Sequence, residues 1–263
     1  MAGLRSRRTT CRLFDGQRLQ VVVPEIVGTD LRRHGLIEPA LTAVLTERLR
    51  PGMVFVDVGA HYGYFTLLAA RRVWPSGAVV AFEPARSTAR VLRANVAHLD
   101  NVMVEETALS DGNGVVRLQD FGPRHSALNT ILSGARVPPA ERRRLRGDAY
   151  EVRTVSLDHY VARRGLRPDF VKLDAEGAEV AILTGMSTVL RECEPLVALE
   201  TGDYPGMASP PTADCIDLLA AMGYGCFEAG EDAGLRPHRR RATYGYGTLF
   251  FTKDAAGAVS AAS

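Results

Sequence analysis

One acid and two glycines stand where an apolar run meets a helix-like segment, in VFVDVGAHYGYFTLLAA at residues 54–70. The acid is Asp57 and the glycines are Gly59 and Gly63, so the turn lacks the middle glycine of the dinucleotide-binding pattern G-x-G-x-x-G. Glycines let a backbone approach a ligand closely, and the N–H groups of a helix that starts there can bind a carboxylate. An acid before the turn disfavours a pyrophosphate and favours a cationic ammonium group, as in the amino-acid tail of S-adenosylmethionine.

A second acid follows the next apolar run, VVAFEP. It is Glu83, which comes 26 residues after Asp57 (83 − 57). A carboxylate at the end of a second strand can bind the ribose diol of either a nicotinamide cofactor or adenosylmethionine. Glu83 therefore predicts an adenosine ligand without choosing between these cofactors, and the turn after Asp57 favours adenosylmethionine.

Strand-like and helix-like patterns alternate from residue 53 onward, which predicts an α/β fold with a mostly parallel sheet and helices on both faces. We expect one domain over residues 51–263, preceded by a hairpin and a helix within residues 1–50 that pack on it. The expected strands cover residues 53–58, 78–84, 101–109, 169–174, 195–200 and 246–253, and the expected helices cover 63–73, 85–99, 178–193 and 211–223.

Residues 111–156 interrupt this alternation with two β-like pieces on either side of a polar stretch. Since they lie between the third and fourth strands, we expect them at the carboxyl edge of the sheet, where ligands bind in such folds. We interpret the insert as a substrate lid. Its arginine-rich run at residues 142–146 fits a solvated helix face better than a phosphate-binding patch.

Several motifs resemble the FkbM family of S-adenosylmethionine-dependent methyltransferases, over roughly residues 35–200. They are VFVDVGAHYGYFTLLAA, AFEP, TALSDGNG, VRTVSLDHY, DFVKLDAEGAEVAILTGM and PLVALE, of which the element Lys172–Glu179 is the most specific. The resemblance implies a Rossmann-like class I methyltransferase sheet of seven strands with the last antiparallel. It also implies methyl transfer to a hydroxyl of a small molecule, often a sugar or another bacterial natural product.

The resemblance also implies which residues bind the cofactor. His61 departs from the family, which more often has asparagine there; it could alter how the methionine tail is held. Tyr64 could place an aromatic face near the sulfonium, or it could be a core tyrosine. Glu38 in GLIEP matches a family element before the first predicted helix of the chain, and it could contact the amino group. The complete expected set is Glu38, Asp57, Gly59, His61, Gly63, Tyr64, Thr66, Glu83, Pro84, Ala108 and Asp174.

Asp174 and Glu200 end consecutive predicted strands, so their side chains should point into one crevice. Asp174 is the first candidate to accept the proton that the nucleophile loses, and His125 in the insert is the second, unless it is a solvated loop residue. Glu200 with Asp203 could orient substrate hydroxyls. Asp174, Glu200 and Asp203 could also bind Mg²⁺, although we predict a site without a metal. Glu176 stays open between a site residue and a helix N-terminal charge.

The composition limits the partners. The net charge of +2 shows no bias toward nucleic acid or membranes, which weighs against an RNA methyltransferase. Only Lys172 and Lys253 are lysines, and the four cysteines lack metal-binding or redox spacing. Without a signal-like or membrane-spanning apolar run we expect a cytoplasmic protein.

Two other functions remain open. The chain could methylate the nitrogen of an amine or guanidine, or it could be a non-catalytic partner protein. It could also form a homodimer.

Overall fold

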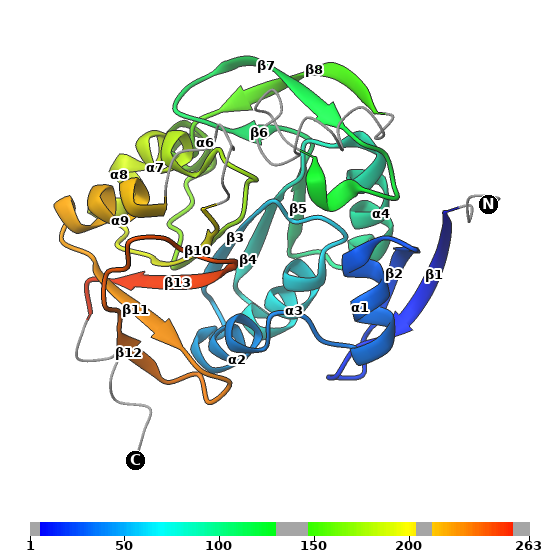
Figure 1. Ribbon diagram of the computed structural model, residues 1–263, viewed down its shortest axis with the longest axis horizontal. Coiled ribbons are helices and arrows are strands. Elements are labelled where there is room, and N and C mark those ends of the chain that lie inside the picture. Colours follow the sequence, from blue (N-terminus) through cyan, green and yellow to red (C-terminus); the bar gives the residue numbers. More distant parts are fainter. Residues whose placement is uncertain (1–5, 130–146, 204–211, 255–263) are drawn as a thin grey trace.

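Strands that are buried on both faces form the middle of the main sheet, as expected for a parallel sheet between helices (Figure 1). The computed structural model describes residues 6–129, 147–203 and 212–254. Its main sheet has the order β12-β11-β13-β10-β9-β3-β4-β5. These strands are β3 (Val54–Val58), β4 (Ala78–Phe82), β5 (Val102–Glu105), β9 (Phe170–Leu173), β10 (Leu196–Thr201), β11 (Gly225–Ala229), β12 (Leu235–Pro237) and β13 (Gly247–Thr252).

The direction of the strands confirms the predicted fold class. β5, β4, β3, β9 and β10 pair in parallel, while β13 lies antiparallel between β10 and β11. These strands and β11 are the seven that the resemblance implies. The short strand β12 extends the sheet by an eighth strand at the edge, where it pairs antiparallel with β11.

Two hydrophobic clusters cover the two faces of the main sheet. Phe55 and Phe170 face the cluster that includes residues of α2 and α3, and their neighbours Val56 and Val171 face the other cluster. This alternation follows from the two-residue period of a strand. The helices are α1 (Ile26–His34), α2 (Pro39–Arg48), α3 (Tyr64–Val73), α4 (Arg86–Val96), α6 (Leu157–Arg164), α7 (Glu179–Gly185), α8 (Ser187–Glu192) and α9 (Thr212–Ala221). Among the described residues, none of the helices has both the length and the apolar character that a membrane span requires.

The N-terminal segment forms a hairpin and two helices. β1 (Arg7–Arg12) and β2 (Arg18–Val23) pair antiparallel around the predicted turn at Asp15 and Gly16, and α1 was not foreseen. The buried residues Leu19 and Val21 belong to the same hydrophobic cluster as Phe55 of β3. The division of the chain at residue 50 stays a prediction.

The insert contributes most of a second, smaller sheet, drawn at the top of Figure 1. Its strands β6 (Ala108–Leu109), β7 (Gly114–Asp120) and β8 (Asp148–Val155) have the order β6-β8-β7, and a short 3-10 helix, η1 (Ser126–Leu128), follows β7. The predicted third strand at residues 101–109 is thus divided between β5 in the main sheet and β6 in the small one. The middle of the predicted lid, including the arginine-rich run at 142–146, lies outside the described residues.

Candidate functional site

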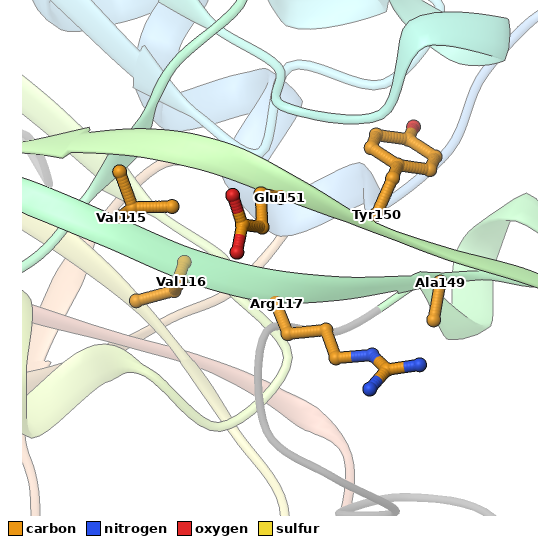
Figure 2. A pocket seen from close by; sticks show the side chains of 6 residues that line it. All are labelled: Val115, Val116, Arg117, Ala149, Tyr150 and Glu151. Carbon is orange, nitrogen blue, oxygen red and sulfur yellow. The ribbon is translucent and has the colours of Figure 1, made fainter.

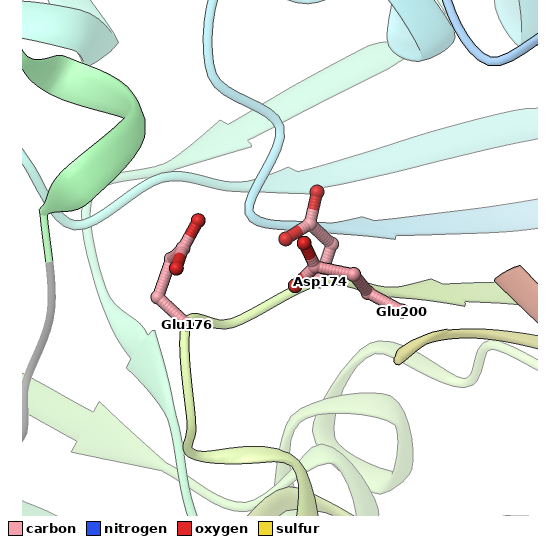
Figure 3. Close-up of side chains that lie close together, drawn as sticks. All are labelled: Asp174, Glu176 and Glu200. Carbon is pink, nitrogen blue, oxygen red and sulfur yellow. The ribbon is translucent and has the colours of Figure 1, made fainter. Parts of the chain in front are cut away.

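Three carboxylates meet at the carboxyl ends of β9 and β10. One oxygen from each of Asp174, Glu176 and Glu200 lies within 4.8 Å of the others. Figure 3 shows Asp174 and Glu200 side by side at the strand ends, with Glu176 on the turn that follows β9. The structure thus brings together the two acids predicted to share a crevice, and it adds Glu176, which has a left-handed backbone conformation with φ of 52°.

Asp203 does not join these acids. One of its carboxylate oxygens accepts a hydrogen bond of 2.8 Å from the backbone N–H of Thr212, and the other accepts one of 2.9 Å from that of Tyr244. Asp203 therefore ties the start of α9 to the segment before β13. The set of Asp174, Glu200 and Asp203 that was considered for Mg²⁺ does not form one group here.

Lys172 lies among the candidate site residues, although the sequence alone did not lead us to predict it there. Its Nζ lies 3.1 Å from Asp174 Oδ2 and 3.6 Å from Asp57 Oδ1, and it donates to the backbone oxygens of Gly59 at 3.1 Å and Val58 at 3.4 Å. Burial alone would lower the pKa of this ammonium group, but the carboxylates of Asp174 and Asp57 outweigh burial and raise it. The lysine is therefore charged, although only 4% of its surface is exposed. The sequence did contain a signal for a special role of Lys172. The chain uses arginine almost everywhere, and one of its two lysines stands in the element that is most specific for the family.

Both glycines of the turn have a left-handed backbone conformation, and at Gly59 packing also requires glycine. Gly59 has φ of 70°, and a Cβ built on it would lie 1.8 Å from the backbone oxygen of Asp174. Gly63, with φ of 87°, precedes α3, and its Cβ would lie 2.5 Å from Leu92 Cδ1. The turn after β3 therefore lies directly against the end of β9. Whether these glycines also let the backbone approach a ligand stays a prediction.

Asp57 is fully buried at the end of β3. Its Oδ2 accepts a 2.5 Å hydrogen bond from the Thr66 hydroxyl, and its Oδ1 lies 3.6 Å from Lys172. Asp57 and Thr66 thus join the strand to the first turn of α3. A bound ammonium group could reach Asp57 only if these partners moved, so direct contact of Asp57 with a cofactor stays a prediction.

Glu83 holds the other half of the same turn. Its Oε2 accepts a hydrogen bond of 2.9 Å from the backbone N–H of His61, and its Oε1 accepts one of 2.9 Å from that of Ala85. Burial raises the pKa of Glu83 to about 8, against the opposing effect of these hydrogen bonds. Pro84 lies between Glu83 and Ala85, and Ala108 lies buried in β6.

Without cofactor, we expect the stability of the parent protein to fall relative to that of Glu83→Gln as the pH rises from about 5 to about 8. The pKa of Glu83 is raised from 4.5 to about 8 in the folded state. The folded protein therefore binds more protons than the unfolded chain in this interval, and its free energy of unfolding decreases with pH. Thermal unfolding of both proteins across this range measures the effect. Parallel curves for the two proteins would contradict it.

Glu38 and Tyr64 differ in their surroundings. The Glu38 carboxylate accepts a hydrogen bond of 3.1 Å from the Thr248 hydroxyl in β13. Burial, and then the negative charge of Asp174, raises the pKa of Glu38 to about 7. Tyr64 is buried, and its hydroxyl lies 3.1 Å from that of Thr42 in α2. Glu38 therefore lies close enough to Asp174 to sense its charge, and Tyr64 lies in the core.

The insert contacts the turn through Ser126 of η1. The Ser126 hydroxyl lies 2.8 Å from His61 Nε2 and 3.0 Å from the hydroxyl of Tyr62. Burial lowers the pKa of His61 to about 3, so its ring is neutral. His125, the neighbour of Ser126, is half-buried, and burial followed by the charge of Arg124 lowers its pKa. The insert therefore lies beside the turn, while proton transfer to His125 stays a prediction.

A cavity of about 220 Å³ lies on the small sheet and not at Asp174, Glu176 and Glu200 (Figure 2). The side chains around it come from β7 and β8, and none of them belongs to the predicted site. They are Val115, Val116, Arg117, Ala149, Tyr150 and Glu151.

Comparison with known proteins identifies relatives of this chain. It is 30% identical over 205 residues to the AMB antimetabolite synthetase AmbE of Pseudomonas aeruginosa, covering 67% of this chain and 10% of that protein. It is 32% identical over 164 residues to the 31-O-demethyl-FK506 methyltransferase FkbM of Streptomyces tacrolimicus, covering 52% and 61% of the two chains. It is 31% identical over 188 residues to the 2-O-methyltransferase NoeI of Sinorhizobium fredii, covering 66% and 73%.

The family model of the methyltransferase FkbM domain matches residues 57–226. The match begins at the buried acid of β3 and ends in β11, so it includes the turn, Glu83, the insert and the acidic group. The chain therefore belongs to the FkbM family of methyltransferases.

Proposed function

We propose that this chain transfers a methyl group from S-adenosylmethionine to a hydroxyl group of a small molecule. The observation that carries the proposal is the turn at residues 59–63, which lies between Glu83 on one side and Lys172 on the other. The same turn lies against Asp174 and thus beside the acidic group. A cofactor on the turn would therefore be next to groups that can bind and deprotonate an acceptor.

The residues of the turn fit adenosylmethionine, which supplies an activated methyl group when bound. Each carboxylate oxygen of Glu83 accepts one backbone hydrogen bond and retains a lone pair, so the carboxylate can accept further bonds from a ribose diol. The first N–H groups of α3, which starts at Tyr64, have no partner within the helix and can bind the methionine carboxylate.

The acidic group supports an acceptor that carries hydroxyl groups. Carboxylates accept hydrogen bonds from hydroxyls, so Glu176 and Glu200 can orient the acceptor while Asp174 accepts the proton. Two relatives, described as a 31-O-demethyl-FK506 methyltransferase and a 2-O-methyltransferase, are named for methylation at oxygen. We propose a hydroxylated natural product, such as a sugar, as the acceptor.

We expect Glu83→Ala to raise the Kd for S-adenosylmethionine about 5- to 150-fold, because loss of two hydrogen bonds to the ribose, at about 0.5–1.5 kcal/mol each, costs about 1–3 kcal/mol. Isothermal titration calorimetry of the parent and the variant measures this change. Glu194→Ala is the matched control, since Glu194 pairs with Lys253 after the end of β13 and should leave the Kd unchanged. An unchanged Kd for Glu83→Ala would show that Glu83 does not hold the ribose, and a parent without affinity would refute the proposed cofactor.

A further inference from the structure

The ammonium group of Lys172 lies between the turn after β3, where we propose that the cofactor binds, and Asp174, the candidate proton acceptor. An ammonium group has three N–H donors, and here it has two backbone oxygens and the Asp174 carboxylate within 3.4 Å. Asp57 adds a longer ion pair at 3.6 Å. A buried charge is costly unless it is paired and hydrogen-bonded, and these contacts satisfy that condition.

The turn after β3 is fixed from two sides. Lys172 donates to the carbonyl oxygens of Val58 and Gly59, where the turn begins. Glu83 accepts from the N–H of His61, further along the turn. The two anchors thus act on different parts of the turn, and each would control a different part of a ligand bound there.

Lys172 also connects the turn to Asp174. In the sheet, Lys172 is in register with Asp57 of β3, and Asp174 follows two residues later. Side chains two residues apart on a strand point to the same face, so the lysine lies between both acids. A single ammonium group therefore fixes the start of the turn relative to the candidate proton acceptor.

We infer that Lys172 is a positioning residue that shapes the turn for the amino-acid tail of the cofactor and holds Asp174 beside it. This inference rests on the proposed function. It separates the cofactor into two parts: the adenosine part depends on Glu83, and the amino-acid part depends on Lys172. Lys172 acts through Val58, Gly59 and Asp174 and does not itself need to touch the ligand.

The test compares two ligands by isothermal titration calorimetry. S-adenosylhomocysteine carries the amino-acid tail, whereas 5′-methylthioadenosine lacks it and keeps the adenosine. We expect Lys172→Met to raise the Kd for S-adenosylhomocysteine about 10- to 100-fold, because the turn loses the charge-assisted hydrogen bonds that hold Val58 and Gly59 in the binding conformation. The Kd for 5′-methylthioadenosine should rise by less than about threefold. The matched control is Lys253→Met at the other lysine of the chain, which pairs with Glu194 at 3.0 Å and should change neither Kd.

Equal losses for both ligands, or an unchanged Kd for S-adenosylhomocysteine, would overturn the inference. Lys172→Met leaves the buried carboxylate of Asp57 without its counter-charge and could therefore fail to fold. In that case the double variant Asp57→Asn with Lys172→Met also removes the charge of Asp57, and it is compared with Asp57→Asn alone. A larger loss for S-adenosylhomocysteine than for 5′-methylthioadenosine in that comparison supports the inference, and equal losses refute it. A parent that binds neither ligand would instead refute the proposed function.

Discussion

Gly59→Val should raise the Kd for S-adenosylmethionine by more than about 100-fold. The φ of 70° at Gly59 strains a β-branched residue, and the first added carbon would lie 1.8 Å from the backbone oxygen of Asp174. Neither backbone segment can yield easily, because Gly59 donates its N–H to Phe82 and Asp174 donates its N–H to Val58. The turn would have to move away from β9, and its contacts with Lys172 and Glu83 would be lost together.

The measurement is calorimetric titration, with circular dichroism to show that the variant remains folded. Gly112→Val is the matched control, because an added Cβ at Gly112 meets nothing within 4 Å. Gly59→Ala adds only the first carbon and should give an intermediate loss. If Gly59→Val bound the cofactor as the parent does, the close approach of the turn to β9 would be wrong.

Asp174→Asn should reduce turnover about 10²- to 10⁴-fold, the usual contribution of a positioned general base. The amide oxygen can still accept the hydrogen bond that Lys172 donates to the carboxylate at 3.1 Å, so the fold and the turn should persist. The free energy of cofactor binding should therefore change by less than about 1 kcal/mol. Methyl transfer to an acceptor that the parent methylates measures the first effect, and calorimetry measures the second.

Asp100→Asn serves as the control, since Asp100 is exposed just before the start of β5. It thus lies at the amino ends of the parallel strands, whereas Asp174 lies at their carboxyl ends. Chelator should not alter the turnover of the parent. A metal role would show itself differently, because chelator would inactivate the parent and excess Mg²⁺ would partly restore the Asn variant. Equal turnover by Asp174→Asn and the parent would make Asp174 structural, and alignment alone would then drive the transfer.

Local patterns were enough to predict where the central strands lie along the chain and that two acids meet at their carboxyl ends. Runs such as residues 54–58 and 170–173 are buried on both faces, which is typical of parallel strands, and both are found as β3 and β9. Parallel strands place their carboxyl ends at one edge, so Asp174 and Glu200 could be expected to meet there.

Contacts between distant segments could not be predicted. The need for glycine at position 59 comes from the backbone of Asp174, and the partners of Lys172 depend on the register of β3 with β9. Asp203 resembled Glu176 as an acid after a strand, but backbone N–H groups of Thr212 and Tyr244 bind it. The division of residues 101–109 into β5 and β6 has no glycine or proline to mark it.

The placement of β13 has a consequence for how the molecule folds. It is the last strand of the described residues, yet it lies inside the sheet, between β10 and β11. During synthesis, β10 therefore exposes one unpaired edge until residues 247–252 have emerged from the ribosome. The hydrogen bond between Glu38 and Thr248 spans 210 residues and forms in the same step. The contact that holds Glu38 is thus available only after the other strands of the sheet have been synthesised.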